Sequence, residues 1–341
     1  MRILITGCAG FVGSEVIRQL DRADGARFVW GLDLGTPASV NWGEVDRILG
    51  PRLVHGDCTN DAIVRRLIAR SKPDVVLHLA AQSHVDESLS DPTGTMLTNA
   101  VGTQVVAHAC ADLSVPMVYC STDEVYGDAW ESDGNIRPRV ETDALLPSSP
   151  YSAGKAAGEM AVRAAARSMG LKYVITRGCN AFGPGQSGDK LVPIVCELLQ
   201  SGEKIPLHGG GEQIRQWIHV SEFAGMLLSV ASALVSGRVE NETFNLAGPR
   251  SCSVRDLASV FARVCDRFDE FCEVVEDRPG QDRAYSIDGS RLRSVLGDEA
   301  KKDIFSLSEI LFLLDSYVGK KSASPAFYGP KNTGEGHNAI V

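Results

Sequence analysis

Apolar runs that alternate with helical patterns constrain the fold of this chain more than any other feature. Over the first 178 residues, runs typical of β-strands lie at 2–6, 26–33, 52–57, 74–81, 115–122 and 171–178. Helical patterns lie between most of them, near 11–23, 60–71, the middle 90s to 113, and 151–170. Strands that are apolar throughout and separated by helices form parallel sheets covered on both faces. The sequence therefore predicts an α/β fold with a doubly wound parallel sheet of the Rossmann type.

Three glycines in GCAGFVG, namely Gly7, Gly10 and Gly13, follow the first predicted strand and open the first predicted helix. Glycines there let the backbone approach a pyrophosphate at a helix N-terminus, where free N–H groups favour an anion, although the motif alone also fits an ordinary turn. Asp33 ends the second predicted strand, where a carboxylate binds ribose hydroxyls and repels a 2′-phosphate, and Asp57 follows the third. Together these features predict a dinucleotide site for NAD rather than NADP.

A Tyr-x-x-x-Lys motif, Tyr151 and Lys155, opens the helix predicted after the fifth strand. At positions i and i+4 the two side chains share one face of a helix. An ammonium group nearby favours phenolate, so we expect the pKa of Tyr151 to be lowered, which produces a general base for a sugar hydroxyl. Many helices carry this spacing by chance, and its place in a dinucleotide fold is what argues against chance here.

Two adjacent carboxylates, Asp123 and Glu124, follow Thr122 at the end of the fifth predicted strand. Ligands of open parallel sheets bind beyond the carboxyl ends of the strands. A dehydration needs an acid for the leaving hydroxyl and a base for a carbon-bound proton, and this pair could supply both. A solvated acidic turn is the competing interpretation, which would be preferred without the neighbouring Tyr-x-x-x-Lys motif.

Composition limits the partners of the chain. A net charge of -9 disfavours binding to nucleic acid or to anionic lipid. No apolar run approaches the roughly 20 residues of a membrane helix, and the N-terminus does not read as a signal peptide. The nine cysteines include no C-x-x-C pair, so we expect no metal site and reduced thiols in a cytoplasmic protein.

These motifs resemble those of the dTDP-glucose 4,6-dehydratase family, within the extended short-chain dehydrogenase/reductase superfamily. The likeness covers about residues 1–318, and its specific pieces are HLAAQSHVDESL (78–89), STDEVYG (121–127), YSAGK (151–155), DKLVP (189–193), QIRQWIHV (213–220) and DRPGQDRAY (277–285). Epimerases and decarboxylases of the superfamily usually carry other residues at the positions of Asp123 and Glu124. The resemblance implies an NAD-dependent lyase that converts a nucleoside-diphosphate hexose, dTDP-glucose before others, into its 4-keto-6-deoxy derivative.

The resemblance also implies catalytic roles, with Lys155 completing the set. Tyr151 takes the proton of the 4-hydroxyl while carbon 4 gives hydride to NAD, and Thr122 hydrogen-bonds the same oxygen. Glu124 then removes the proton of carbon 5, and Asp123 protonates the 6-hydroxyl, which leaves as water. The hydride returns to carbon 6, so the cofactor is regenerated in each turnover and should stay bound.

The same likeness implies two sets of binding residues, and it leaves His84 and Asp86 without a chemical role. The expected NAD contacts are Gly7, Gly10, Phe11, Val12, Gly13, Asp33, Asp57, Cys58, Leu79, Ala80, Ala81, Ser83, Thr98, Tyr151 and Lys155. The expected contacts of the sugar nucleotide are Ser83, Asn180, Lys190, Leu191, Pro206, His208, Arg215, Asn245 and Arg278.

Four positions depart from the residues usual in the family. Cys8 replaces Gly, Ala181 a second Asn, His208 a Tyr and Gln281 a His. The last three lie in the expected sugar-nucleotide half, so the base and the hexose stay open, and the substrate could be a UDP-sugar or an amino sugar. The sequence also leaves room for a nucleotide-sugar 4-epimerase or decarboxylase of the same fold and, in a different class, for a non-catalytic dinucleotide-sensing protein.

After residue 178, glycine and proline become frequent, and the remaining patterns predict a strand at 244–248 and helices at 253–268 and 306–318. We predict an NAD-binding domain at 1–178 with a returning segment at about 211–248. A smaller C-terminal substrate-binding domain takes 179–210 and 249–319, and 320–341 form a mobile tail. Small residues along helix 151–169 permit close helix packing, and the resemblance implies a homodimer built from this helix and the one ending near 113.

Overall fold

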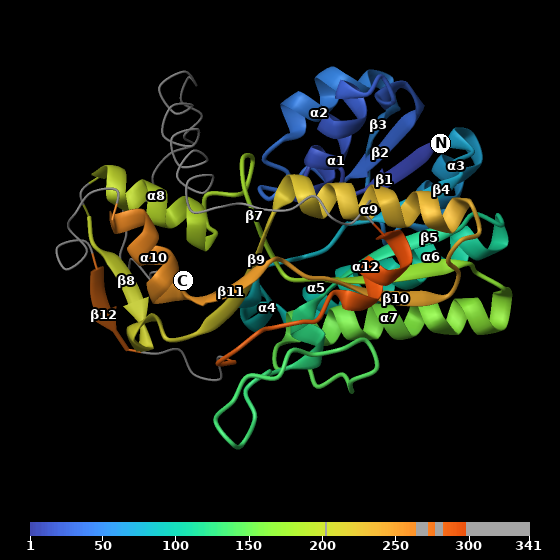
Figure 1. Ribbon diagram of the computed structural model, residues 1–341. Coiled ribbons are helices and arrows are strands. Elements are labelled where there is room, and N and C mark those ends of the chain that lie inside the picture. The colour runs from blue at the N-terminus through green and yellow to red at the C-terminus, as the bar shows by residue number, and fades with distance from the viewer. Residues whose placement is uncertain (202, 264–271, 277–281, 298–341) are drawn as a thin grey trace.

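The computed structural model describes residues 1–201, 203–263, 272–276 and 282–297. At its centre lies a seven-stranded sheet in the order β10-β6-β5-β4-β1-β2-β3, and all its pairings are parallel (Figure 1). This arrangement confirms the predicted fold class. The strands are β1 (Ile3–Thr6), β2 (Val29–Asp33), β3 (Leu53–His55), β4 (Val75–His78), β5 (Met117–Thr122), β6 (Tyr173–Gly178) and β10 (Glu242–Leu246).

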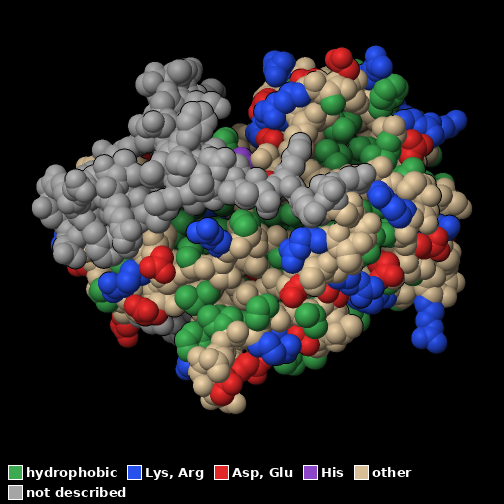
Figure 2. All heavy atoms as spheres, viewed as in Figure 1, with side chains coloured by type: hydrophobic (Ala, Val, Ile, Leu, Met, Phe, Trp, Pro, Cys, Tyr) green, Lys and Arg blue, Asp and Glu red, His purple; other side chains and the backbone are tan. Residues whose placement is uncertain are grey.

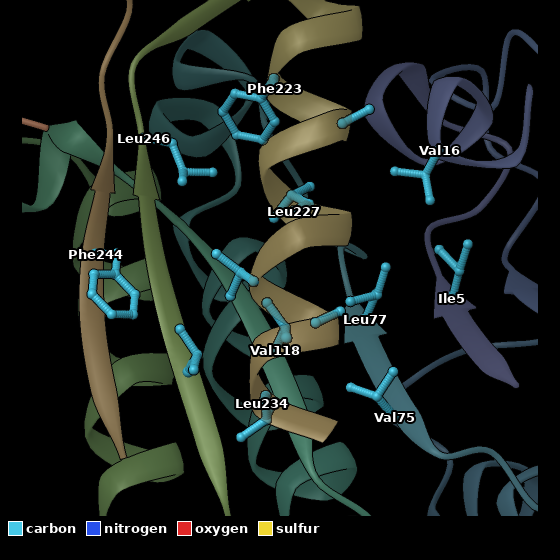
Figure 3. Packing of buried hydrophobic residues seen from close by; sticks show 14 of the residues in the cluster. Ile5, Val16, Val75, Leu77, Val118, Phe223, Leu227, Leu234, Phe244 and Leu246 are labelled. Atoms are coloured by element: carbon cyan, nitrogen blue, oxygen red, sulfur yellow. The ribbon is translucent and has the colours of Figure 1, made fainter. Parts of the chain in front are cut away.

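Helices cover both faces of this sheet over two separate apolar cores. One face carries α1 (Phe11–Arg22), α2 (Trp42–Leu49), α9 (Val220–Val235) and α12 (Ser290–Leu296), and the other carries α3 (Asp61–Ser71), α6 (Thr103–Asp112) and α7 (Pro150–Met169). Figure 3 shows side chains of the strands, such as Val118 and Phe244, beside Leu227 of α9. The sequence patterns did not predict α9 or α2. On the face in Figure 2, acidic and basic side chains are interspersed over these helices.

The helix predicted up to residue 113 is interrupted. After α4 (Val85–Ser90), the chain forms α5 (Pro92–Met96), a π-helical turn (Leu97–Gly102) and then α6. Single π-helical turns inside α-helices often mark functional sites. This turn packs against α7.

A smaller unit is built from the later part of the chain. A three-stranded sheet, in the order β11-β9-β7, contains β7 (Asn180–Phe182), β9 (Ile214–His219) and β11 (Arg250–Ser253). Beside it, β8 (Ile205–His208) pairs with β12 (Cys272–Val275), and α8 (Leu191–Ser201) and α10 (Val254–Arg263) complete an apolar cluster.

The chain returns to the large sheet through α9 and β10, whereas β9 belongs to the small sheet. The segment that re-enters the large sheet therefore begins at about residue 220 and not at 211. The helix predicted at 306–318 and the predicted tail at 320–341 lie outside the described residues. Among the helices that the structure describes, none is long and apolar enough to cross a membrane.

Candidate active site

The predicted catalytic residues come from two neighbouring elements at the carboxyl edge of the large sheet. Thr122 ends β5, and the 3₁₀ turn Asp123–Tyr126 follows directly. Tyr151 lies in the first turn of α7, whose N-terminus is fixed by a capping box between Ser149 and Ser152. Such caps satisfy the free N–H groups of a first turn and define where the helix begins. The sequence of 149–152 thus fixes where the helix that carries Tyr151 starts.

The surroundings of the two carboxyl groups in the turn shift the pKa of each. Asp123 is 3% exposed, and burial, followed by the charge of Glu124, raises the pKa of Asp123 to about 8. Burial raises the pKa of Glu124 to about 7, against the opposing charges of Arg215 and Lys190. Both carboxyl groups thus titrate near neutral pH, where one can hold a proton while the other has lost it, as an acid and a base require.

We predicted a lowered pKa for Tyr151, and this prediction is wrong for the side chains of the protein alone. Burial, followed by the charge of Glu124, raises that pKa well above its usual value, and a hydrogen bond from Thr122 only partly offsets this. The ammonium of Lys155 lies over the ring of Tyr119, 4.8 Å from its centroid. Burial also lowers the pKa of Lys155. Desolvation disfavours the charged forms of both Tyr151 and Lys155.

The glycine-rich loop has the shape that a pyrophosphate cradle needs. Gly7 has φ +70°, and a Cβ there would lie 2.7 Å from the backbone of Ala80. A Cβ on Gly13 would lie 2.4 Å from the carbonyl oxygen of Gly7. No side chain caps the N-terminus of α1, so this end of the helix remains available to an anion. These residues fit NAD at the predicted place.

Asp33, buried at the end of β2, accepts hydrogen bonds from the N–H of Ala9 (2.8 Å) and of Gly35 (3.0 Å) and from the Ser39 hydroxyl (2.5 Å). A carboxylate offers about four acceptor sites, so capacity for a ribose hydroxyl remains. These bonds hold the carboxylate at the sheet edge beside the glycine loop.

The other residues expected at NAD lie around the same edge. Burial raises the pKa of Cys58 to about 12, so its thiol remains protonated. Thr98 lies in the π-helical turn, and Ser83 lies on the exposed loop that follows β4. Half-buried residues complete this set, namely Phe11, Val12, Asp57, Leu79, Ala80 and Ala81.

Two cations of the expected substrate set lie near the carboxylates. The ammonium of Lys190 donates to the carbonyl of Ser83 at 3.2 Å, and its charge lowers the pKa of Glu124. The guanidinium of Arg215 donates to the carbonyl of Asp282 at 3.1 Å and lies 4.4 Å from the ring centroid of Tyr285. A lysine and a planar guanidinium at one place suit a diphosphate.

The remaining expected substrate residues are spread over the smaller unit. The Nδ2 of Asn180 on β7 is buried without a hydrogen-bond partner within the described structure, and Leu191 opens α8. Pro206 and His208 lie on β8, where Nδ1 of His208 lies 2.9 Å from the carbonyl of Glu276.

Arg278 and Gln281 lie outside the described residues. Two more positions that depart from the family are described: Ala181 on β7 pairs with β9, and the buried Cys8 packs against β2.

Asn245, expected at the substrate, has a different position. It lies on β10 and is fully buried, and its amide accepts from the Tyr126 hydroxyl and donates to the carbonyls of Arg139 and Asp288. All three bonds are internal to the protein. The structure therefore gives Asn245 a packing role and does not bring it to the surface of the site.

The model of the family described as "NAD dependent epimerase/dehydratase family" matches residues 3–247. This chain belongs to that family.

Similar members of the family include dTDP-glucose 4,6-dehydratase 1 of Escherichia coli K12, which is 35% identical over 324 residues and aligns over 87% of this chain and 88% of that protein. The dTDP-glucose 4,6-dehydratase of Xanthomonas campestris pv. campestris B100 is 36% identical over 325 residues, with the same coverage. These relatives confirm the predicted family resemblance.

Solved structures give the same result. The dTDP-glucose 4,6-dehydratase DesIV of Streptomyces venezuelae, with NAD and TYD bound, has a TM-score of 0.84 and 32% identity over 94% of this chain and 98% of that one. The UDP-glucose 4-epimerase of Thermotoga maritima, with UDP-glucose, has a TM-score of 0.81 and 28% identity, over 94% and 100% of the chains. Family members of both activities therefore share this fold.

Two contacts of this family member were not predicted. Asn99, buried in the π-helical turn, exchanges two 2.9 Å hydrogen bonds with the backbone of Gln82, which fixes the loop after β4. His84 on that loop pairs with Asp189, so the loop is joined to the smaller unit. Asparagine is a poor helix former, and its place within a predicted helix was the available signal for the first contact. The second joins residues too distant in sequence to be paired by a local pattern.

Proposed function

We propose that this chain is an NAD-dependent nucleotide-sugar 4,6-dehydratase, with dTDP-glucose as its first candidate substrate. The placement of the two carboxyl groups carries this proposal. Asp123 and Glu124 are adjacent at the end of β5, beside α7, which carries Tyr151, and burial raises the pKa of both toward neutral pH. An elimination of water needs this pair, whereas epimerisation at carbon 4 has no leaving hydroxyl to protonate. The dehydratase relatives support the same activity.

The glycine loop, Asp33 and the residues after β4 would hold NAD, which when bound would supply the oxidant for carbon 4, the reductant for carbon 6 and a positive charge. Because burial raises the pKa of Tyr151, this residue becomes a base only with positive charge nearby. Lys155, one helical turn further along α7, supplies part of that charge. Thr122 orients the phenol, which takes the proton of the 4-hydroxyl.

The acid and the base of the turn then carry out the elimination. Once carbon 4 is a ketone, the proton on carbon 5 becomes acidic, and Glu124 removes it. The bond between carbon 6 and its oxygen breaks, and the proton of Asp123 makes the leaving group water. Reduction of carbon 6 and the return of a solvent-derived proton to carbon 5 then complete the 4-keto-6-deoxy sugar. Arg215 and Lys190 hold the diphosphate, and their charges oppose the rise in the pKa of Glu124 that burial causes.

A 4-epimerase is the second candidate, because an epimerase shares this fold. Mass spectrometry of the product from dTDP-glucose and, separately, from UDP-glucose in heavy water separates the two. A dehydratase gives loss of one water with one deuterium at carbon 5, and the better substrate identifies the base. No mass loss with either substrate would favour an epimerase or another hexose. Release of NAD without turnover of any sugar nucleotide would favour a non-catalytic sensor.

We also propose a cytoplasmic homodimer. The helices α5–α6 and α7 pack side by side, and their outer surface exposes Leu97 (51%), Val101 (42%) and Met160 (49%). Apolar side chains that gather on one surface mark an interaction site. All eight described cysteines are free thiols, as suits a reducing compartment. Light scattering should give a dimer for the protein and a monomer for Met160→Glu, and a monomeric wild type would exclude this interface.

A further inference from the structure

A buried ion pair lies between the catalytic helix and the large sheet. Arg177 on β6 donates from Nε to Oε1 of Glu159 at 2.9 Å and from Nη2 to Oε2 at 2.7 Å. The two side chains are 2% and 0% exposed. A buried pair of charges often stabilises a fold no more than apolar residues of the same size would.

The pair connects the helix that carries Tyr151 to the strand beside β5. Glu159 lies on α7 one turn beyond Lys155, so both side chains lie on the same face of the helix. Arg177 is the residue before the last on β6, directly beside Ser121 in β5. The ion pair thus fixes α7 to the sheet at the level where β5 ends.

The other face of Arg177 contacts the turn that carries the acid and the base. Its guanidinium lies 4.6 Å from the ring centroid of Tyr126, the last residue of the turn Asp123–Tyr126. Burial raises the pKa of Tyr126 to about 12, so its hydroxyl stays protonated and donates to Asn245 at 2.8 Å. Arg177 also donates to the carbonyl of Glu141, on the loop between the turn and α7. One side chain therefore contacts helix, turn and connecting loop.

We propose that Arg177 is a positioning residue that fixes the turn bearing Asp123 and Glu124 relative to the helix bearing Tyr151. This inference rests on the proposed function, in which the helix carries the oxidation of carbon 4 and the turn carries the elimination. A displacement of roughly 1 Å between reacting groups can cost about a hundredfold in rate. Loosening the turn would slow elimination more than oxidation, so oxidised substrate and reduced cofactor would accumulate together.

The test replaces both charges, Arg177→Met with Glu159→Leu, because apolar residues of similar size can preserve stability where a single replacement leaves a buried charge. Tyr126→Leu is a second variant, which leaves the ion pair intact. Arg163→Met is the matched control. Arg163 lies on the same helix and contacts Glu159 at 3.9 Å, but it donates to the hydroxyl of Thr243. Each variant is compared for kcat, KM, thermal midpoint and absorbance of reduced nicotinamide during turnover.

We expect the double variant and Tyr126→Leu to lose about tenfold to a hundredfold in kcat, with KM close to wild type. The thermal midpoint should stay close to wild type in the double variant and fall in Tyr126→Leu, which leaves the buried amide of Asn245 without its hydroxyl partner. Reduced nicotinamide should build up in both variants and stay at the wild-type level in Arg163→Met. Unchanged kcat, or a loss of turnover with no build-up of reduced nicotinamide, would overturn the positioning role. If the wild type turned over no sugar nucleotide, the proposed function would fail, and this inference would fail with it.

Discussion

The pKa order of Asp123 and Glu124 predicts a narrow pH window for turnover. The active form needs Glu124 ionised (pKa about 7) and Asp123 protonated (pKa about 8). The value of kcat/KM should therefore pass through a maximum between pH 7 and pH 8 and fall on both sides of it, by up to about tenfold for each further pH unit.

One substitution tests why kcat/KM falls on the acidic side of the profile. Lys190→Met removes a positive charge that lowers the pKa of Glu124, so that pKa should rise and the acid limb should move to higher pH. Lys172→Met is the matched control, since this lysine is 61% exposed and pairs with Glu240. The profile is measured as kcat/KM from pH 5.5 to 10, with product quantified by mass spectrometry. A flat wild-type profile from pH 6 to 9, or an acid limb that Lys190→Met leaves in place, would refute the reasoning.

Three further perturbations test other parts of the structure. Tyr151→Phe should lose about a hundredfold or more of turnover and keep its NAD, measured as cofactor released from purified protein, and wild-type-like activity would contradict its role. Gly7→Ala should purify with much less NAD, because the added Cβ would lie 2.7 Å from the Ala80 backbone, and full NAD content would exclude the cradle. Burial lowers the pKa of His78 to about 3, so the native state binds fewer protons than the unfolded state below pH 6.5, and stability should fall as the pH drops. The loss due to His78 should reach about 2 kcal/mol at pH 5, measured by urea unfolding, and an equal loss in His78→Asn would assign it to other groups.

Local sequence signals were sufficient for the strands of the large sheet in the first half of the chain. The strands that form the centre of the large sheet are buried on both faces, so their apolar runs are continuous and easily read. Backbone geometry fixes Gly7 and Asp33 at the ends of those strands, so their spacing in the sequence predicts the dinucleotide site directly. Residues 149–152 likewise determine where α7 begins.

The same reasoning missed α9 for a physical reason. This helix packs between the large sheet and α1, and eight of its residues are buried. A helix surrounded by protein has no polar face, so it lacks the period that identifies an amphipathic helix. The smaller unit was hard to read because its strands are short and its pairings join segments distant in sequence.

The sequence by itself determined which chemical groups stand at the site, because spacing within one helix or one turn brings Tyr151 near Lys155 and Asp123 beside Glu124. Only the tertiary structure decided how those groups behave. Burial raises the pKa of Tyr151, where the neighbouring lysine alone indicated a lowering. It also raises the pKa values of Asp123 and Glu124 toward neutral pH. It also gives Asn245 a packing role. Desolvation depends on everything that surrounds a group, and those surroundings come from segments more than a hundred residues apart.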